Sequence, residues 1–201
     1  MVPRYATVLA LALPLTACGS MTVRDFEGES PRFALEDYFQ GTTKAHGIFR
    51  DRFGDVRRRF AVDVEGEWDA ESRTLTLDED FRYADGETDN RVWTIEKTGP
   101  HSYVGTAGDV VGEAEGKAYG PAFTWSYTLK LPVADSTWRV HVEDWMFRQS
   151  EGVVLNTASV SKWGFEVGTL TIAFHKPGAR AAAVPVPGEL AAGPEMAAES
   201  P

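Results

Sequence analysis

The chain has 201 residues, a formal net charge of −10 at pH 7 and one cysteine. An acidic chain without an extended basic region is a poor partner for nucleic acid or for anionic lipid head groups, so we expect no nucleic-acid partner. A single cysteine permits no disulfide within the chain, and the fold must be stabilised by a hydrophobic core.

The N-terminus has the features of a secretory signal. Arg4 supplies a positive charge and residues 8–15 form an apolar run that is too short to span a membrane. The small pair Thr16-Ala17 then precedes Cys18. This stretch resembles the bacterial lipoprotein signal, in which the chain is cut before the cysteine and the thiol is acylated. We predict a signal peptide over 1–17, lipidation of Cys18 and attachment to a membrane; the alternative is a secreted protein with an unrelated cysteine.

The next segment predicts a tether followed by a short helix. Residues 18–29 are mostly polar. Ser30 is suited to be a helix N-cap and Pro31 to occupy the first helical position. We expect a short N-terminal helix or turn here that closes one end of the following domain. Its apolar residues are Phe33, Leu35, Tyr38 and Phe39.

The C-terminal segment differs in composition from the rest of the chain. Residues 177–201 contain no aromatic residue and hold five of the eleven prolines. Such a segment cannot bury enough apolar surface to offset its conformational entropy, which predicts a disordered Pro/Ala-rich tail. The folded domain is therefore expected over 30–176.

Between Thr42 and Lys176, apolar and polar residues alternate, and turn-forming residues interrupt the pattern about every eight to fifteen residues. The clearest alternation runs from Phe123 to Leu131. The pattern predicts an all-β domain of about eight to ten antiparallel strands. Sequential hairpins without crossover helices favour an up-and-down barrel over a sandwich, and a barrel of that size can hold one small ligand.

Residues 108–122 carry an unusual run of small side chains. Every second residue is Gly or Ala, apart from Val110. If this face points inward, it either leaves open volume for a ligand or makes room for the bulky Trp125 and Tyr127. Glycines also mark bends and bulges in barrels, so a purely structural role is a further interpretation.

Polar residues occur in phase with the apolar faces of the predicted strands. These are Glu79, Arg91, Asp144, Asn156 and Lys162. Because a buried charge persists only when it is paired and hydrogen-bonded, we predict a polar cluster inside the barrel. The alternatives are that a bulge shifts the register of a strand, or that the cluster is a structural network without a ligand.

Several stretches together resemble the bacterial lipoproteins that carry the domain of unknown function numbered 3833, over about Tyr38 to Lys176. The resemblance implies an envelope lipoprotein with a lipocalin-like barrel and no established activity. It also implies the outer membrane, facing the periplasm, because Gly19 stands where an aspartate would favour retention at the inner membrane. The stretches are residues 47–54, 79–86, 91–93, 105–114, 144–146 and 156–162.

Enzyme motifs are missing from the sequence. There is no nucleophile elbow or phosphate loop, and the four histidines have no metal-ligand spacing, so we predict no metal and no cofactor. Glu79 and Asp144 would qualify as an acid and base pair if both faced one cavity. An enzyme acting on lipids is therefore the less favoured function.

The favoured hypothesis is a module that binds a small apolar or amphipathic molecule inside the barrel. Arg91 or Lys162 would meet the carboxylate of a fatty-acyl-like ligand, while Trp93, Trp125 and Tyr127 would lie along its apolar part. This hypothesis predicts a cavity of roughly a few hundred cubic ångströms. The alternative is a structural or interaction lipoprotein whose barrel is filled by its own side chains.

Overall fold

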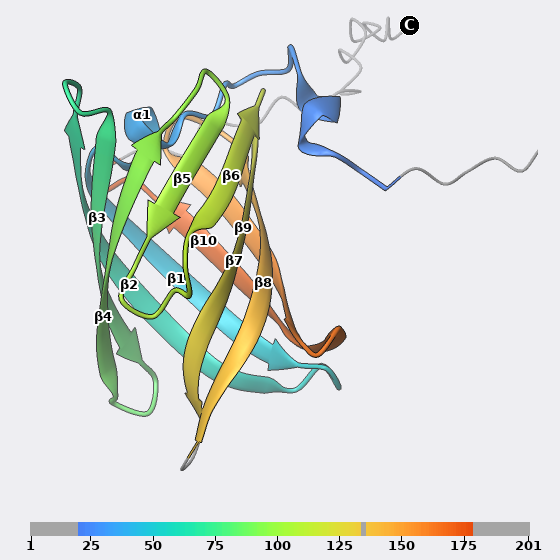
Figure 1. Ribbon diagram of the computed structural model, residues 1–201. Coiled ribbons are helices and arrows are strands. Elements are labelled where there is room, and N and C mark those ends of the chain that lie inside the picture. Colours follow the sequence, from blue (N-terminus) through green and yellow to red (C-terminus); the bar gives the residue numbers. More distant parts are fainter. Residues whose placement is uncertain (1–19, 134–135, 179–201) are drawn as a thin grey trace, which may run out of the picture.

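The computed structural model describes residues 20–133 and 136–178, which form a closed barrel of ten antiparallel strands (Figure 1). Each strand pairs with its neighbours in sequence, and β10 pairs with β1 to close the ring. The predicted up-and-down barrel is confirmed. The elements are η1 (Val23–Phe26), α1 (Leu35–Phe39), β1 (Gly41–Asp51), β2 (Val56–Asp69), β3 (Thr74–Tyr83), β4 (Thr88–Lys97), β5 (Ser102–Thr106), β6 (Ala114–Tyr119), β7 (Ala122–Val133), β8 (Ser136–Arg148), β9 (Val153–Lys162) and β10 (Phe165–His175).

The alternating residues lie as the sequence predicts, with the apolar set inside the ring. On β7, Phe123, Trp125 and Tyr127 are buried, and the residues between them face outward to varying degrees. A period of two places one side of each strand against the core, and the neighbouring strands present matching apolar positions to it. None of the helices among the described residues has the length and apolarity that crossing a membrane requires.

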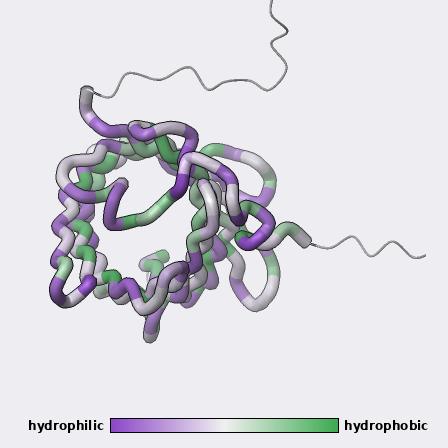
Figure 2. Tube along the Cα trace, turned by 90° about the horizontal axis from the view of Figure 1, so that it is seen from above, coloured by the Kyte–Doolittle hydropathy of each residue, from purple (hydrophilic) through white to green (hydrophobic). Residues whose placement is uncertain are grey.

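The segment before β1 closes one end of the barrel, as predicted. Figure 2 looks down the barrel and shows this segment crossing the opening. Phe33, Tyr38 and Phe39 are almost fully buried, and the rings of Phe39 and Phe174 lie 5.4 Å apart, edge to face. Glu36 forms a buried ion pair with Lys97, so the short helix is fixed to the wall by charge as well as by packing.

The prediction of Ser30 as the N-cap is wrong. The helix begins at Leu35, and its N-cap is Ala34, which makes no side-chain cap hydrogen bond. Phe33 instead donates its backbone N–H to the carbonyl of Gly120 at 2.7 Å, which holds the chain in a non-helical path across the end of the barrel. Tertiary pairing therefore overrides the local capping signal.

Part of the predicted tether lies against the barrel. The turn η1 packs on β6 and β7, and the ring of Phe26 lies 5.5 Å from that of Phe147. Arg24 donates a hydrogen bond of 3.0 Å to the Tyr119 hydroxyl. The predicted signal peptide, Cys18 and the predicted tail from residue 179 onward lie outside the described residues.

The small residues around β6 make room for Trp125. A Cβ atom added to Gly116 would lie 2.2 Å from Cε3 of Trp125, and one added to Gly105 would lie 2.7 Å from its Cζ2. The indole therefore occupies the volume that two glycines leave free. Within the small-residue run, 114–119 form β6 and Ala122 begins β7. The residues before β6 form a loop, where a Cβ on Gly108 would meet nothing within 4 Å.

We expect Gly116→Ala to lower the free energy of unfolding by about 1–3 kcal/mol, because the methyl group overlaps the Trp125 ring and forces a shift in the core. Gly108→Ala is the matched control and should change stability by less than about 0.5 kcal/mol. Urea unfolding followed by tryptophan fluorescence measures both. Equal stability of the two variants would contradict the packing role of Gly116.

Candidate ligand-binding site

The barrel encloses a cavity of about 410 Å³, which confirms the predicted size and contradicts the alternative of a filled interior. Its upper end is bounded by Leu35 and Phe39 of the α1 plug. At the opposite end it is lined by Arg57 and Arg58, whose side chains are 56% and 38% exposed, so the cavity opens to solvent there. Most of the lining between these ends is aromatic or aliphatic.

A first polar group forms on β3 and β4. Glu79 and Arg91 face each other across the two strands, with 4.0 Å between Oε2 and Nη1. The guanidinium of Arg91 also donates to Asp109, from Nε at 3.0 Å and from Nη2 at 2.6 Å to Oδ2. The Arg91 cation is therefore held between two carboxyl groups.

Asp109 was not among the predicted site residues. It lies in the loop between β5 and β6, which β7 holds in place: Lys130 donates its N–H to the Asp109 carbonyl at 2.8 Å, and Val111 donates to Thr128 at 2.8 Å. An arginine at an inward position of β4 signals that a carboxylate must approach it. The choice among the loop acids depends on long-range packing, which no local spacing reveals.

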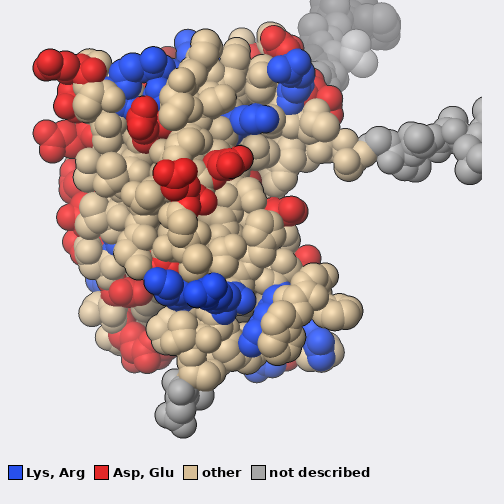
Figure 3. All heavy atoms as spheres, in the orientation of Figure 1, with Lys and Arg blue, Asp and Glu red and all other residues tan. Residues whose placement is uncertain are grey.

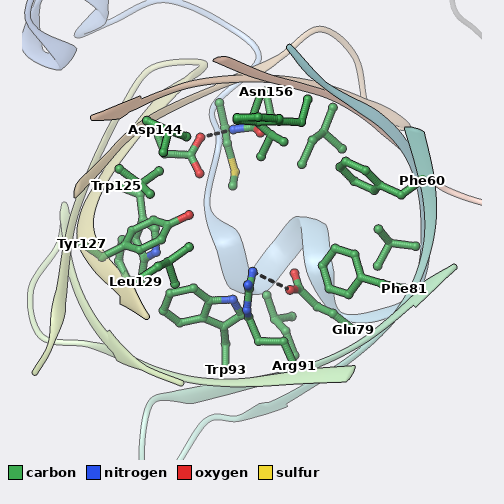
Figure 4. A pocket seen from close by; sticks show the side chains of 18 of the residues that line it. Phe60, Glu79, Phe81, Arg91, Trp93, Trp125, Tyr127, Leu129, Asp144 and Asn156 are labelled. Carbon is green, nitrogen blue, oxygen red and sulfur yellow. Dashed lines mark hydrogen bonds and ion pairs between the residues drawn. The ribbon is translucent and has the colours of Figure 1, made fainter. Parts of the chain in front are cut away.

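A second polar group forms on β8 and β9. The side-chain amide of Asn156 donates to Asp144 and, at 3.1 Å, to the carbonyl of Trp145. The amide oxygen of Asn156 is buried and has no hydrogen-bond partner among the described residues. Figure 4 shows the two polar groups on opposite sides of the cavity, with the Tyr127 hydroxyl pointing inward.

Burial shifts the titration of both cavity carboxyls. It raises the pKa of Glu79 to about 7, with Arg91 acting in the opposite direction and Asp109 adding to the rise. Burial likewise raises the pKa of Asp144 to about 7, against the opposing hydrogen bond from Asn156. Both groups therefore exchange protons near neutral pH, which is unusual for carboxylic acids.

The structure brings seven of the eight predicted ligand-binding residues together and leaves one apart. The ammonium of Lys162 lies 3.2 Å from the centre of the Trp138 ring, beyond the cavity lining. Val160 is the last inward residue of β9 that reaches the cavity, and Lys162 lies one step closer to the open end. The residues that line the cavity are Glu79, Arg91, Trp93, Trp125, Tyr127, Asp144 and Asn156.

The fold and the cavity together define a lipocalin-like β-barrel protein. The chain belongs to the family described as Protein of unknown function (DUF3833), whose model matches residues 12–176. A search of curated proteins finds no match. Among solved structures, an S-type phycobiliprotein lyase from Guillardia theta has a similar fold, with a TM-score of 0.54 and 10% identity over 74% of this chain and 96% of that chain.

Because the folded-state pKa values of Glu79 and Asp144 lie above those of the unfolded chain, the folded state binds more protons between about pH 4.5 and 7. Stability should therefore fall as pH rises through this range, by roughly 2–3 kcal/mol for each of the two groups. The double variant Glu79→Gln, Asp144→Asn should flatten this dependence in urea unfolding. Asp63→Asn is the control, since the pKa of Asp63 is lowered to about 2 and lies below the range; an unchanged slope in the double variant would contradict the assignment.

Proposed function

We propose that the protein binds one small amphipathic molecule inside the barrel, with the apolar part of the ligand among the aromatic and aliphatic side chains. The observation that carries this proposal is the cavity of about 410 Å³, which opens at one end and contains a few convergent polar groups. Binding sites for small molecules have this size and composition. A barrel that served only as a scaffold would have no need for this internal volume.

The polar groups favour a ligand head that donates hydrogen bonds. Glu79 and Asp144 are acceptors when they are ionised, and the amide oxygen of Asn156, which has no hydrogen-bond partner among the described residues, is a further acceptor. Arg91 is already bound by Asp109, so it is poorly placed to receive the carboxylate of a fatty acid. We therefore propose an acyl-like body carrying a hydroxyl, amide or amine group rather than a free carboxylate.

Binding is tested with N-phenyl-1-naphthylamine, an apolar fluorescent amine. We expect enhanced emission with the protein and loss of most of it with Val142→Phe, which fills the cavity from the buried wall of β8. Val92→Phe, at a position that is 43% exposed, is the matched control. At pH 8, dodecanol or dodecylamine should displace the probe at lower concentration than dodecanoate. Absence of binding, or equal emission with Val142→Phe, would contradict the proposal.

A second candidate function is acid–base catalysis on the bound molecule. Glu79 and Asp144 line the same cavity, and each has a pKa of about 7. Such values suit groups that give and take protons near neutral pH. Recovery of a chemically altered ligand after incubation with the wild-type protein, but not with Glu79→Gln or Asp144→Asn, would support it.

We also propose that the protein is an outer-membrane lipoprotein, attached through acylated Cys18 and facing the periplasm. The support is the position of the cysteine directly after an apolar run and two small residues. Cys18→Ser should abolish labelling with radioactive palmitate, and a high-salt wash, which weakens electrostatic binding, should release this variant but not the wild-type chain from the membrane fraction. A wild-type chain that takes up no label would contradict the anchor.

A further inference from the structure

Two neighbouring hairpins at the open end of the barrel expose large aromatic side chains. Phe53 lies in the β1–β2 turn, and Trp163 and Phe165 lie in and after the β9–β10 turn; they are 76%, 86% and 73% exposed. These are the three most exposed large apolar residues of the described chain. Because β1 pairs with β10, the hairpins are adjacent, and Arg52 donates its N–H to Val167 at 3.1 Å between them. We call this surface, residues 50–57 and 162–166, the hairpin rim.

The turn that carries Trp163 is unfavourable for a tryptophan. Trp163 has a φ of 53° and Gly164 a φ of 81°, so both residues of the two-residue turn are left-handed. Asn-Gly is the favoured pair in such a turn, and a bulky side chain there costs free energy. The exposure of the apolar indole to water adds a further unfavourable free energy. Neither folding nor packing explains a tryptophan at this position, which points to contact with something outside the chain.

The hairpin rim is basic although the protein is acidic. The rim holds three arginines and one lysine against two aspartates and one glutamate, and Arg58 and Arg59 adjoin it, in a chain with a net charge of −10. Among the described residues, Arg50, Arg52 and Lys162 form no ion pair, and the ammonium of Lys162 lies 4.4 Å from the centre of the Trp163 ring. Figure 3 shows Lys and Arg side chains gathered at the lower end of the barrel beside uncharged surface.

We propose that the hairpin rim docks on a lipid bilayer that carries anionic head groups, with Phe53, Trp163 and Phe165 entering the interface and the neighbouring cations meeting phosphates. Amphipathic aromatic rings favour the interfacial region, and each Lys or Arg near an anionic surface adds to the attraction. The rim lies at the same end of the barrel as Arg57 and Arg58, which line the cavity there. Docking therefore places the cavity opening at the lipid surface, and it does not depend on what the cavity binds.

The test uses the mature chain, residues 18–201, with Cys18→Ser so that no acyl chain contributes. We expect it to sediment with vesicles of phosphatidylethanolamine and phosphatidylglycerol, less with phosphatidylcholine, and less at high salt. Trp163→Asn and Phe53→Ser should each weaken binding roughly tenfold. Trp163→Asn places the favoured residue in the turn, so misfolding does not explain a loss. Leu155→Asn is the matched control, a leucine 45% exposed on the wall of β9, and should bind normally.

No sedimentation of the wild-type chain, or equal binding by Trp163→Asn, would overturn the proposal. A concentration-dependent dimer in light scattering that Trp163→Asn abolishes, without vesicle binding, would also overturn it and would assign the rim to a second copy of the chain. The cavity variant Val142→Phe should retain vesicle binding. The vesicle assay therefore tests membrane docking and the naphthylamine assay tests ligand binding, and either proposal can be contradicted without the other.

Discussion

The pairing of β1 with β10 is the constraint on which the rest of the structure depends. Closing ten strands into a ring pairs the backbone of every strand on both sides and leaves no free edge. The width of the interior then follows from the number of strands rather than from the side chains, and a ring of ten is wider than one that side chains alone fill. Closure therefore produces both the stability of the fold and the space within it.

The interior contains groups that a stable core would not need. Asp144 and Asn156 on one wall, and Glu79 and Arg91 on the other, remain polar in surroundings that disfavour charge. Replacing such groups by apolar residues of similar volume is often neutral or stabilising in proteins. These polar groups are retained at the cavity surface, and the amide oxygen of Asn156 has no partner within the described part of the chain. Both features are typical of functional sites, which are often less stable than an apolar core would be.

Alternation in the sequence predicted the face that each side chain occupies but not its height along the barrel axis. This is why Glu79 and Arg91 were correctly placed inside, whereas Lys162, in phase on its strand, lies past the cavity. Asp109 was not predicted because it lies in a loop, where the alternation of strand residues does not apply, and the path of that loop brings it to Arg91. The glycines facing Trp125 could be interpreted in two ways until three-dimensional packing decided between them.

The α1 plug makes the two ends of the barrel different, one closed and one open. The α1 segment and η1 sit together at one end, so the N-terminal end of the described chain leaves the molecule on the closed side, and the mouth lies at the far side (Figure 1). A chain tethered by its N-terminus would hold its mouth remote from its own attachment point. A ligand of the proposed kind would then enter or leave the cavity without any displacement of the tether. The orientation of the molecule would decide which surface the mouth of the barrel faces.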